Sequence, residues 1–432
     1  MVPNYRNYNN KEVEFMNKES LNPLENAQLR IKSACEALDL PDAVYELLKE
    51  PQRVIEISIP VNMDDGSLKV FKGYRAVHND AVGPGKGGIR FHQDVTLDEI
   101  KALSIWMSLK CCVLGLPLGG GKGGVAVDPT TLSKRELERL SRGYVRGIWK
   151  YLGEKIDVAA PDVNTNAQIM GWMADEYMNI TGEYSPGIIT GKPVVWGGSK
   201  GRTEATGFGV AIVAREACKR LGININEAKV ALQGFGNVGS YSAKHLQQQG
   251  AKVVAIAFRD FALYNKDGID YKDLSDFIKN NRDKKSYPNA KVISTDEFWS
   301  LSVDILVPAA LENAITSDIA KKINAKLICE GANGPITLDA DEILMEKGIS
   351  VTPDILTNAG GVTVSYFEWV QNLYSHYWSA EEVIDREERA MVEAFNDIWD
   401  VVEKYNVSIR QAAYMSSVKK IADVMKVRGW YR

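Results

Sequence analysis

The sequence is poor in the side chains that most often bind metals. Its four histidines, at positions 78, 92, 245 and 376, form no H-x-x-x-H pair. The five cysteines are odd in number and contain no C-x-x-C pair, which argues against a disulfide framework and against a zinc site. We therefore expect no metal centre, and we expect buried free thiols in a reducing compartment.

Long apolar runs and a large excess of one charge are also absent. No run of 18 apolar residues occurs, so we predict no membrane span. Residues 1–15 (MVPNYRNYNNKEVEF) lack the apolar core of a signal peptide, and we interpret them as a polar tail. The 52 basic and 56 acidic residues give a net charge of −4, which offers no basic field to nucleic acid or to a membrane surface. These observations predict a cytoplasmic protein without such partners.

The length of 432 residues, with 45% hydrophobic and 25% charged residues, is typical of a globular chain of two domains. Over the first 190 residues, helical patterns mix with strand patterns. Asn22 and Pro23 begin a helical pattern, and Ile55, Ile57 and Ile59 alternate with polar residues as in a strand. Further segments are predicted as a second strand at 68–78 and as helices at 97–110 and 133–152.

After residue 200, short apolar runs alternate with helical stretches. Such an alternation predicts a parallel, doubly wound sheet. The runs are at 229–233, 252–257, 303–309, 326–330 and 349–352. Residues 365–432 are helical in pattern again, and we expect them to close back onto the first domain or to bridge the two.

A glycine motif, Gly234-Phe-Gly236-Asn237-Val238-Gly239, directly follows the run at 229–233 and opens a helical stretch. This is the context of a dinucleotide-binding turn, in which the glycines permit a tight turn, a close approach of the pyrophosphate and close packing of helix on strand. We therefore predict an α/β fold with a Rossmann-type dinucleotide domain over 191–364. The N-terminal α/β domain then covers 1–190, with 365–432 returning to it.

The choice between NAD and NADP stays open. The position where an acid usually binds the ribose of NAD holds Phe258, followed by Arg259 and Asp260. Arg259 suits the 2′-phosphate of NADP, whereas Asp260 suits the ribose if the loop register shifts. A solvated loop arginine is an equally good interpretation of Arg259.

A second glycine-rich region, 83–124, contains Lys86, Lys110 and Lys122. It lacks the spacing and the hydroxyl residue of a phosphate-binding P-loop. Three ammonium groups near one site suit a small dicarboxylate or tricarboxylate and lower one another's pKa. For Lys110 alone, a solvated helix residue is the favoured interpretation, but Gly-Lys-Gly-Gly twice is hard to explain by packing. Asp162 follows a possible strand at 155–160 and is either a proton-transfer group or a helix cap.

Together these segments resemble the amino-acid dehydrogenases acting on Glu, Leu, Val and Phe, and most closely the hexameric glutamate dehydrogenases. The resemblance covers about residues 25–432. It rests on GYRAVHNDAVGPGKGGIRFH, PLGGGKGG, APDVNTN, ITGKPVVWGGSKGRTEATGFG, QGFGNVGS, EGANGP, LTNAGGVTVSYFEWVQN and the terminal RGW.

The resemblance implies a role for each matching residue. Lys122 matches the lysine that activates the water attacking the imino acid, and Asp162 matches the carboxylate that moves protons to and from the amine. Lys110 matches the ligand of the substrate α-carboxylate, and Lys86 with Ser365 matches the pair that binds the side-chain carboxylate. Contacts to the nucleotide and nicotinamide are implied for Arg202, Thr206, Asn237 and Asn358.

The implied activity is the reversible, NAD- or NADP-dependent oxidative deamination of L-glutamate to 2-oxoglutarate and ammonia by a homohexamer with a closing interdomain cleft. The pair Lys86 and Ser365 favours glutamate, because relatives acting on apolar amino acids lack it. The alternatives are a branched-chain or phenylalanine dehydrogenase and a silent dinucleotide-binding regulatory subunit. The Ile256–Asp260 stretch departs from the family pattern, in which a Ser-Asp ending is common, and this leaves the cofactor preference open.

Overall fold

The computed structural model describes residues 22–432, and the polar tail expected at the N-terminus lies outside this range. The described residues form two compact units. The N-terminal unit consists of residues 22–202, Val362–Val383 and Tyr414–Arg432, and the central unit consists of Thr203–Gly361 and Ile384–Ala413. The predicted boundary assigned all of 365–432 to the first domain, whereas Ile384–Ala413 belongs to the central unit. None of the described helices is both long enough and apolar enough to cross a membrane.

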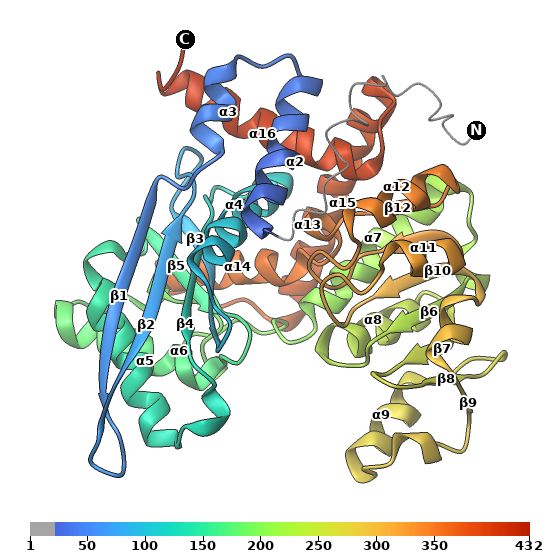
Figure 1. The fold of residues 1–432 in the computed structure, drawn as a ribbon, viewed down its shortest axis with the longest axis horizontal. Helices are drawn as coiled ribbons and strands as arrows, with labels where there is room; N and C mark the ends of the chain where they lie inside the picture. The colour runs from blue at the N-terminus through green and yellow to red at the C-terminus, as the bar shows by residue number, and fades with distance from the viewer. Residues whose placement is uncertain (1–21) are drawn as a thin grey trace. The chain divides into compact units, whose positions relative to one another are not determined.

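The described part of the N-terminal unit is built on a five-stranded sheet with strand order β1-β2-β4-β3-β5 (Figure 1). Its strands are β1 (Arg53–Asn62), β2 (Leu68–Val77), β3 (Gly85–His92), β4 (Gly121–Ala126) and β5 (Asp157–Pro161). Its helices are α2 (Pro23–Ala37), α3 (Asp42–Leu48), α4 (Leu97–Val113), α5 (Lys134–Ile148), α6 (Ala167–Thr181), most of α14 (Gly360–Tyr374) and most of α16 (Ile409–Val427). Short 3-10 helices lie at η1 (Pro129–Thr131), η2 (Trp149–Tyr151), η3 (Pro186–Ile188) and η4 (Val194–Trp196).

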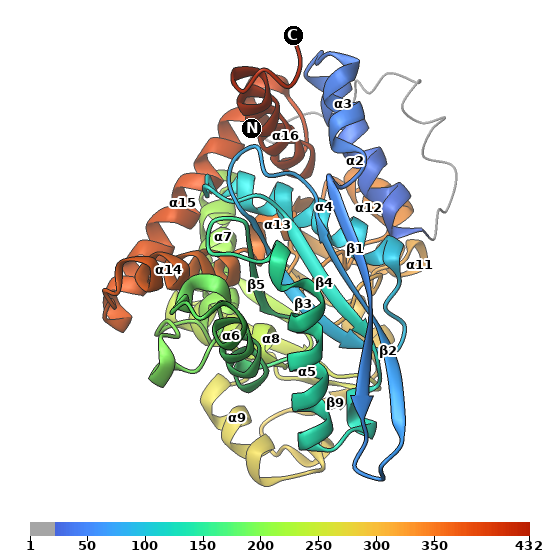
Figure 2. The ribbon, with the colours of Figure 1, turned by 90° about the vertical axis from the view of Figure 1, so that its left-hand side faces the viewer.

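Helices cover both faces of this sheet. Helices α5 and α6 lie on the same face of the sheet, as Figure 2 shows, and share one core with β1, β3 and β4. Helix α4 packs on the opposite face through Ile100. Local signals in the sequence set the helix starts: Asn22 accepts from Leu24 N at the start of α2, and Ser133 forms a capping box with Glu136 at the start of α5.

The glycine-rich strands β3 and β4 were not predicted as strands, and the structure explains their glycines by packing. A Cβ on Gly87 would lie 1.5 Å from the carbonyl oxygen of Gly121 on the neighbouring strand. A Cβ on Gly123 would lie 2.3 Å from the hydroxyl of Tyr144 in α5. The interpretation that packing does not account for these glycines was therefore wrong, because protein atoms fill the space beside them.

Within its described residues, the central unit holds a seven-stranded sheet of order β12-β11-β10-β6-β7-β8-β9. The five predicted runs form the parallel strands β6 (Lys229–Gln233), β7 (Lys252–Ala257), β10 (Ser302–Pro308), β11 (Asn324–Cys329) and β12 (Ser350–Thr352). The short antiparallel strands β8 (Ala262–Tyr264) and β9 (Lys291–Ile293) were not predicted.

The helices of the central unit lie on both faces of its sheet. On one face, α10 (Thr295–Trp299), α11 (Ser317–Lys322) and α12 (Leu338–Glu346) share a core with the strands. In the sheet, β7 lies on one side of β6 and β10 lies on the other side. Because crossovers between parallel strands are right-handed, this order places α8 (Asn237–Gln248), the helix that follows β6, on the opposite face. The remaining helices are α7 (Ala205–Leu221), α9 (Tyr271–Asn280), α13 (Asp354–Thr357), most of α15 (Ala380–Tyr405), η5 (Ile225–Glu227) and η6 (Lys284–Ser286). The predicted α/β class with a Rossmann-type domain is confirmed.

Candidate active site

Lys86 lies at the start of β3 and is almost completely buried, with 1% of its surface exposed. Its Nζ donates to Thr190 Oγ1 at 2.9 Å, and Ser365 Oγ of α14 lies 2.5 Å from the same Thr190 oxygen. One threonine thus joins the two residues predicted to share a substrate carboxylate. The structure brings Lys86 and Ser365 to one polar cluster inside the N-terminal unit.

Burial lowers the pKa of the Lys86 ammonium to about 7. The nearby positive charges of Arg75 and Arg202 add to this effect, whereas Cys111 and Glu368 oppose it. An anionic ligand at this position would stabilise the charged form, because an opposite charge favours the ammonium. The cluster is therefore suited to binding an anion rather than an apolar group.

Lys122 and Asp162 form a second cluster in the same unit. Lys122, on β4, is 4% exposed, and its Nζ donates to Asp162 Oδ1 at 2.9 Å. Asp162 follows β5 directly, and its other oxygen accepts from Arg90 Nε at 2.7 Å. Arg90 in turn pairs with Glu99 of α4. The Asp162 carboxylate thus lies between two cations, with 18% of its side chain exposed.

These neighbours set the protonation of both groups. Burial lowers the pKa of Lys122, and Asp162 only partly opposes this change. Burial acts to raise the pKa of Asp162, but Lys122 and Arg90 outweigh burial and hold that pKa well below its usual range. An ionised carboxylate lies in direct contact with an ammonium group whose pKa is lowered. Such a pair can exchange protons with a bound amine and a water molecule.

Lys110 occupies the last turn of α4. Its charge helps to lower the pKa of Lys122, and both Lys110 and Lys86 act on the thiol pKa of Cys111. The three lysines are therefore electrostatic neighbours in the N-terminal unit, as the sequence predicted, and the alternative of three separate solvated lysines is wrong.

Two polar residues of this site were not singled out from the sequence. Arg90 lies four residues after Lys86 on β3, so both project to the same side of the strand, and this spacing was an available signal. Thr190 stands in the segment ITGKPVV, but no local spacing indicates its role, since its contacts with Lys86 and Ser365 span 104 and 175 positions of sequence.

In the central unit, the turn after β6 has the geometry that the glycine motif predicts. Gly234 has a positive φ of 94°, and a Cβ on Gly239 would lie 2.1 Å from the Gly234 carbonyl oxygen. Nothing lies within 4 Å of a Cβ built on Gly236, the residue that precedes α8. The turn stands where the strand order reverses between β6 and β10, which is where open α/β sheets bind nucleotides. These residues fit a dinucleotide.

Other predicted cofactor residues lie around this turn. Asn237 begins α8 and donates to Thr203 O at 3.1 Å, and Val238 follows it in the first helical turn. Asn358, at the end of α13, donates to Asn333 Oδ1 at 2.9 Å. Thr206 lies in the first turn of α7. Arg202 is placed in the N-terminal unit by its contacts, where its charge acts on Lys86.

The residues after β7 form a tight turn in which Phe258 N donates to Phe261 O at 2.8 Å. The rings of these two residues stack, and Lys284 Nζ lies 4.8 Å from the centre of the Phe258 ring. Arg259 and Asp260 are both exposed at the tip of this turn. The structure thus presents both candidate ribose or phosphate ligands at the end of β7 and does not select between them.

Comparison with known proteins agrees with this geometry. Residues 51–179 match the family described as Glu/Leu/Phe/Val dehydrogenase, dimerisation domain, and residues 197–429 match Glutamate/Leucine/Phenylalanine/Valine dehydrogenase. The chain is 61% identical to a NAD-specific glutamate dehydrogenase of Clostridioides difficile, over 96% of this chain and 100% of the relative.

Solved structures give the same result. Glutamate dehydrogenase from Peptoniphilus asaccharolyticus is 56% identical with a TM-score of 0.86, and the alignment covers 95% of this chain and all of that one. The hetero-hexameric glutamate dehydrogenase from Thermus thermophilus, in its Leu-bound form, is 35% identical with a TM-score of 0.89, over 96% and 99% of the two chains. The chain belongs to the Glu/Leu/Phe/Val dehydrogenase family.

Proposed function

We propose that this protein is a NAD-dependent glutamate dehydrogenase that catalyses the reversible oxidative deamination of L-glutamate to 2-oxoglutarate and ammonia. The observation that carries this proposal is the buried cluster of Lys86, Thr190 and Ser365. A buried ammonium with two hydroxyl groups suits a carboxylate, whereas an aliphatic or aromatic side chain would bring no negative charge to the Lys86 ammonium. The names of the similar relatives support the same substrate.

In this proposal, Lys86 and Ser365 bind the side-chain carboxylate, and Lys110 binds the α-carboxylate. Asp162 accepts a proton from the substrate ammonium. A bound nicotinamide dinucleotide would supply the acceptor for the Cα hydride, whose loss turns the amine into the imino group. Lys122 then orients and activates the water that attacks the imino carbon, and ammonia leaves. The contacts of Lys122 and Asp162 with each other support their acting as one proton-transfer unit.

The dinucleotide would be held by the turn of Gly234, Gly236 and Gly239 and by the start of α8, with Asn237 and Val238. Thr206, Asn358 and Arg202 are the further proposed contacts. We favour NAD over NADP because the similar relatives are named NAD-specific. In that case Arg259 has no 2′-phosphate to bind and remains an exposed loop residue.

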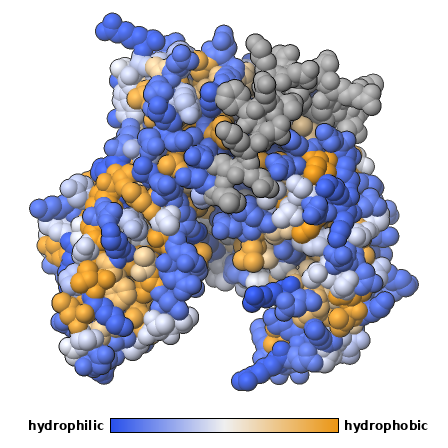
Figure 3. Space-filling model, viewed as in Figure 1, coloured by the Kyte–Doolittle hydropathy of each residue, from blue (hydrophilic) through white to orange (hydrophobic). Residues whose placement is uncertain are grey.

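The proposed working form is a homohexamer in the cytoplasm. The hydrophobic residues Leu68 and Val70 of β2 are 62% and 61% exposed, and β1 is the outer strand of its sheet. Figure 3 shows hydrophobic side chains gathered on the face of the N-terminal unit that carries β1 and β2. Such a patch is typical of a subunit interface. The five free, buried cysteines fit a reducing compartment.

A steady-state assay tests the function and the cofactor together. The purified protein should catalyse reductive amination of 2-oxoglutarate with ammonia, with a higher kcat/KM for NADH than for NADPH. A preference for NADPH that Arg259→Ala selectively removes would instead assign Arg259 to the 2′-phosphate. Absence of turnover with either cofactor would support the silent regulatory subunit and contradict the proposal.

The substrate assignment has its own variant. Lys86→Leu should lose most activity with glutamate and retain turnover of apolar amino acids, while the exposed Lys155→Leu should behave as wild type. Unchanged glutamate kinetics in Lys86→Leu would remove Lys86 from the pocket. Higher wild-type kcat/KM for leucine, valine or phenylalanine than for glutamate would favour the branched-chain or phenylalanine dehydrogenase.

A further inference from the structure

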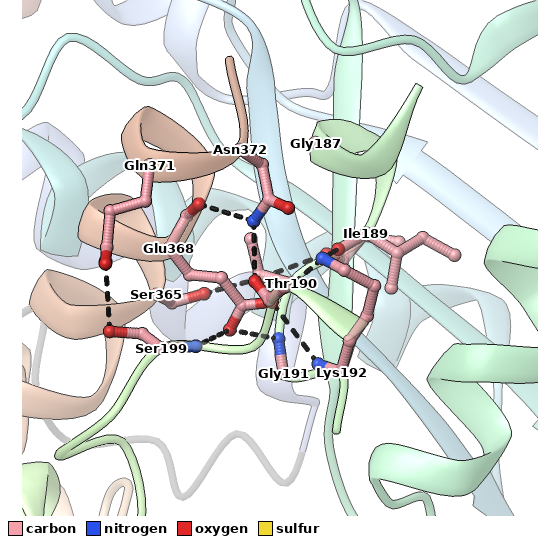
Figure 4. A network of polar contacts seen from close by, with 12 residues as sticks. Gly187, Ile189, Thr190, Gly191, Lys192, Ser199, Ser365, Glu368, Gln371 and Asn372 are labelled. Atoms are coloured by element: carbon pink, nitrogen blue, oxygen red, sulfur yellow. Dashed lines mark hydrogen bonds and ion pairs between the residues drawn. The ribbon is translucent and has the colours of Figure 1, made fainter. Parts of the chain in front are cut away.

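A fully buried ion pair, Lys192 with Glu368, lies beside Thr190 and Ser365 (Figure 4). Their side chains are 0% and 1% exposed, and Lys192 Nζ lies 2.9 Å from Glu368 Oε1. None of the roles proposed above uses either residue. Burying two charges is costly unless every polar atom finds a partner, so a pair in this position needs an explanation.

The carboxylate of Glu368 is the centre of a network of backbone contacts. Its Oε2 accepts from Gly191 N at 2.9 Å and from Ser199 N at 3.3 Å, and its Oε1 accepts from Lys192 N at 3.3 Å. Lys192 Nζ also donates to Ile189 O at 2.5 Å. Both ends of the 189–199 segment are therefore folded onto one side chain of α14.

The shape of this segment depends on the same contacts. Gly191 has a φ of 77°, and a Cβ there would lie 2.4 Å from Pro161 Cδ, so the backbone passes too close to β5 for any side chain. Two further residues of α14 hold the far end: Asn372 donates to Gly197 O at 2.9 Å, and Gln371 donates to Ser199 Oγ at 3.1 Å. One face of α14 thus defines the path of the whole segment.

The network is joined directly to the candidate substrate pocket. Thr190 immediately precedes Gly191, which Glu368 holds, and Ser365 lies one helical turn before Glu368 on the same face of α14. Thr190 Oγ1 is in turn within hydrogen-bond distance of both Lys86 Nζ and Ser365 Oγ. A shift of Gly191 would therefore carry Thr190 out of its position between the lysine and the serine.

The charge of Glu368 provides a second connection between the ion pair and Lys86. The charged and titratable groups acting on Lys86 are Cys111 of α4, Arg75 of β2, Glu368 of α14 and Arg202. Burial lowers the Lys86 pKa most, Arg75 and Arg202 lower it further, and Glu368 acts with Cys111 to raise it. Removing the charge of Glu368 would leave Lys86 with a still lower pKa, so that its ammonium form would be lost at a lower pH.

We propose that Glu368 is a positioning residue for the side-chain carboxylate of the substrate, and that with Lys192 it holds Thr190 and Ser365 around the Lys86 ammonium. This proposal rests on the proposed glutamate dehydrogenase function. Glu368 does not touch the substrate; it acts through the backbone of Gly191 and through its charge.

The test compares Glu368→Gln with Glu183→Gln, an exposed control in the same unit. Glu368→Gln should raise KM for 2-oxoglutarate about tenfold or more, leave KM for NADH unchanged, and move the alkaline limb of kcat/KM to lower pH. A purely structural role would lower the amount of active enzyme without moving KM or the pH profile. The control should match wild type in every parameter.

A double-mutant cycle tests the route through Thr190. Thr190→Val removes the hydroxyl while leaving the backbone contacts of Glu368 in place. If Glu368 acts through Thr190, the double variant should raise KM by clearly less than the product of the two single effects. Multiplicative effects would exclude this route.

A variant with a shorter carboxylate separates the effect of geometry from the effect of charge. It also provides a test of the proposal if Glu368→Gln does not fold. Glu368→Asp keeps the charge but cannot reach all its partners, so KM should rise while the pH profile stays near that of wild type. If the wild type is active and Glu368→Asp has the same KM for 2-oxoglutarate as the wild type, the positioning role is overturned but the proposed function is not. Inactive wild-type enzyme would instead overturn the proposed function.

Discussion

At the scale of single residues, the charge state of Asp162 depends on its two cationic partners. Lys122 Nζ and Arg90 Nε contact different oxygens of one carboxylate, so both oxygens are already paired. This arrangement keeps the carboxylate ionised at all physiological pH values, because both cations lower its pKa. Proton transfer to and from the substrate then depends on the exchange of a proton between Lys122 and Asp162 as much as on Asp162 itself.

We predict that Asp162→Asn lowers kcat by about 10²- to 10⁴-fold, the usual contribution of a positioned proton-transfer group. The amide preserves the shape of the side chain but cannot accept the substrate proton. Steady-state kinetics should therefore show a loss in kcat while KM for NADH stays near wild type. Asp94→Asn, at an exposed acid of the same unit, is the matched control. Near-native turnover in Asp162→Asn would show that another group moves the proton.

Residue types were predictable from the sequence, but their partners were not. Lys86, Lys110, Lys122 and Asp162 stand in recognisable motifs, and the structure places them in one unit. Thr190 also stands in a recognisable segment, ITGKPVV, but its role could not be inferred there, because its contact with Ser365 spans 175 residues of sequence and depends on the folded path of the chain. The catalytic and binding roles of the three lysines and of Asp162 remain predictions.

At the scale of elements, the first turn of α16 is tied to the end of β11 by a buried ion pair. Arg410 donates to both oxygens of Glu330, each at 2.8 Å, and its Nε lies 2.8 Å from Asp341 Oδ2 of α12. Burial raises the pKa of Glu330 to about 7, although Arg410 opposes this change. Glu330 also accepts from Asp354 N, so it helps to fix the start of α13, the short helix that precedes Asn358.

We predict that Arg410→Met destabilises the protein by about 3–5 kcal/mol, because it leaves a buried carboxylate without its counter-charge. The pKa of Glu330 should rise further in the folded variant. The loss of unfolding free energy should therefore be small at pH values below the pKa that Glu330 has in the unfolded chain, and it should grow as pH increases through and above 7. Urea unfolding of the variant and wild type at pH 5 and pH 8 measures this difference.

The pairing itself can be checked with two more variants. Arg410→Met combined with Glu330→Gln should recover part of the lost stability and most of the pH dependence. Lys404→Met, at an exposed position of α15, should have little effect. Equal destabilisation by Arg410→Met at both pH values would show that packing, rather than charge, explains the effect.

Strands with alternating or continuous apolar residues were predictable, whereas glycine strands were not. The runs that became β6, β7, β10, β11 and β12 carry a hydrophobic signal of their own. Strands β3 and β4 carry little, since their glycines exist to let backbones and Tyr144 approach closely. Such a requirement belongs to the neighbouring element and cannot be inferred from local sequence.

At the scale of the whole molecule, the chain divides into two units that are not continuous in sequence. The residues 384–413 belong to the central unit although they are flanked by segments of the N-terminal unit. The helical pattern of α15 indicates an apolar face but not which core receives it. The assignment of substrate binding and oligomerisation to the N-terminal unit, and of dinucleotide binding to the central unit, remains a proposal.

The exposed apolar residues of β2 argue for an assembled form that can be tested directly. Burying a leucine or valine side chain contributes about 1.5–3 kcal/mol, so Leu68 and Val70 together could supply a substantial part of one interface. Sedimentation equilibrium of the wild type should give six times the chain mass of 47.9 kDa. Leu68→Asp with Val70→Asp should shift the mass to smaller species at micromolar concentration, because each interface would then bury unpaired charges. Leu311→Asp, at an exposed leucine of the central unit, should remain hexameric. A double variant with the wild-type mass would exclude this surface from the assembly.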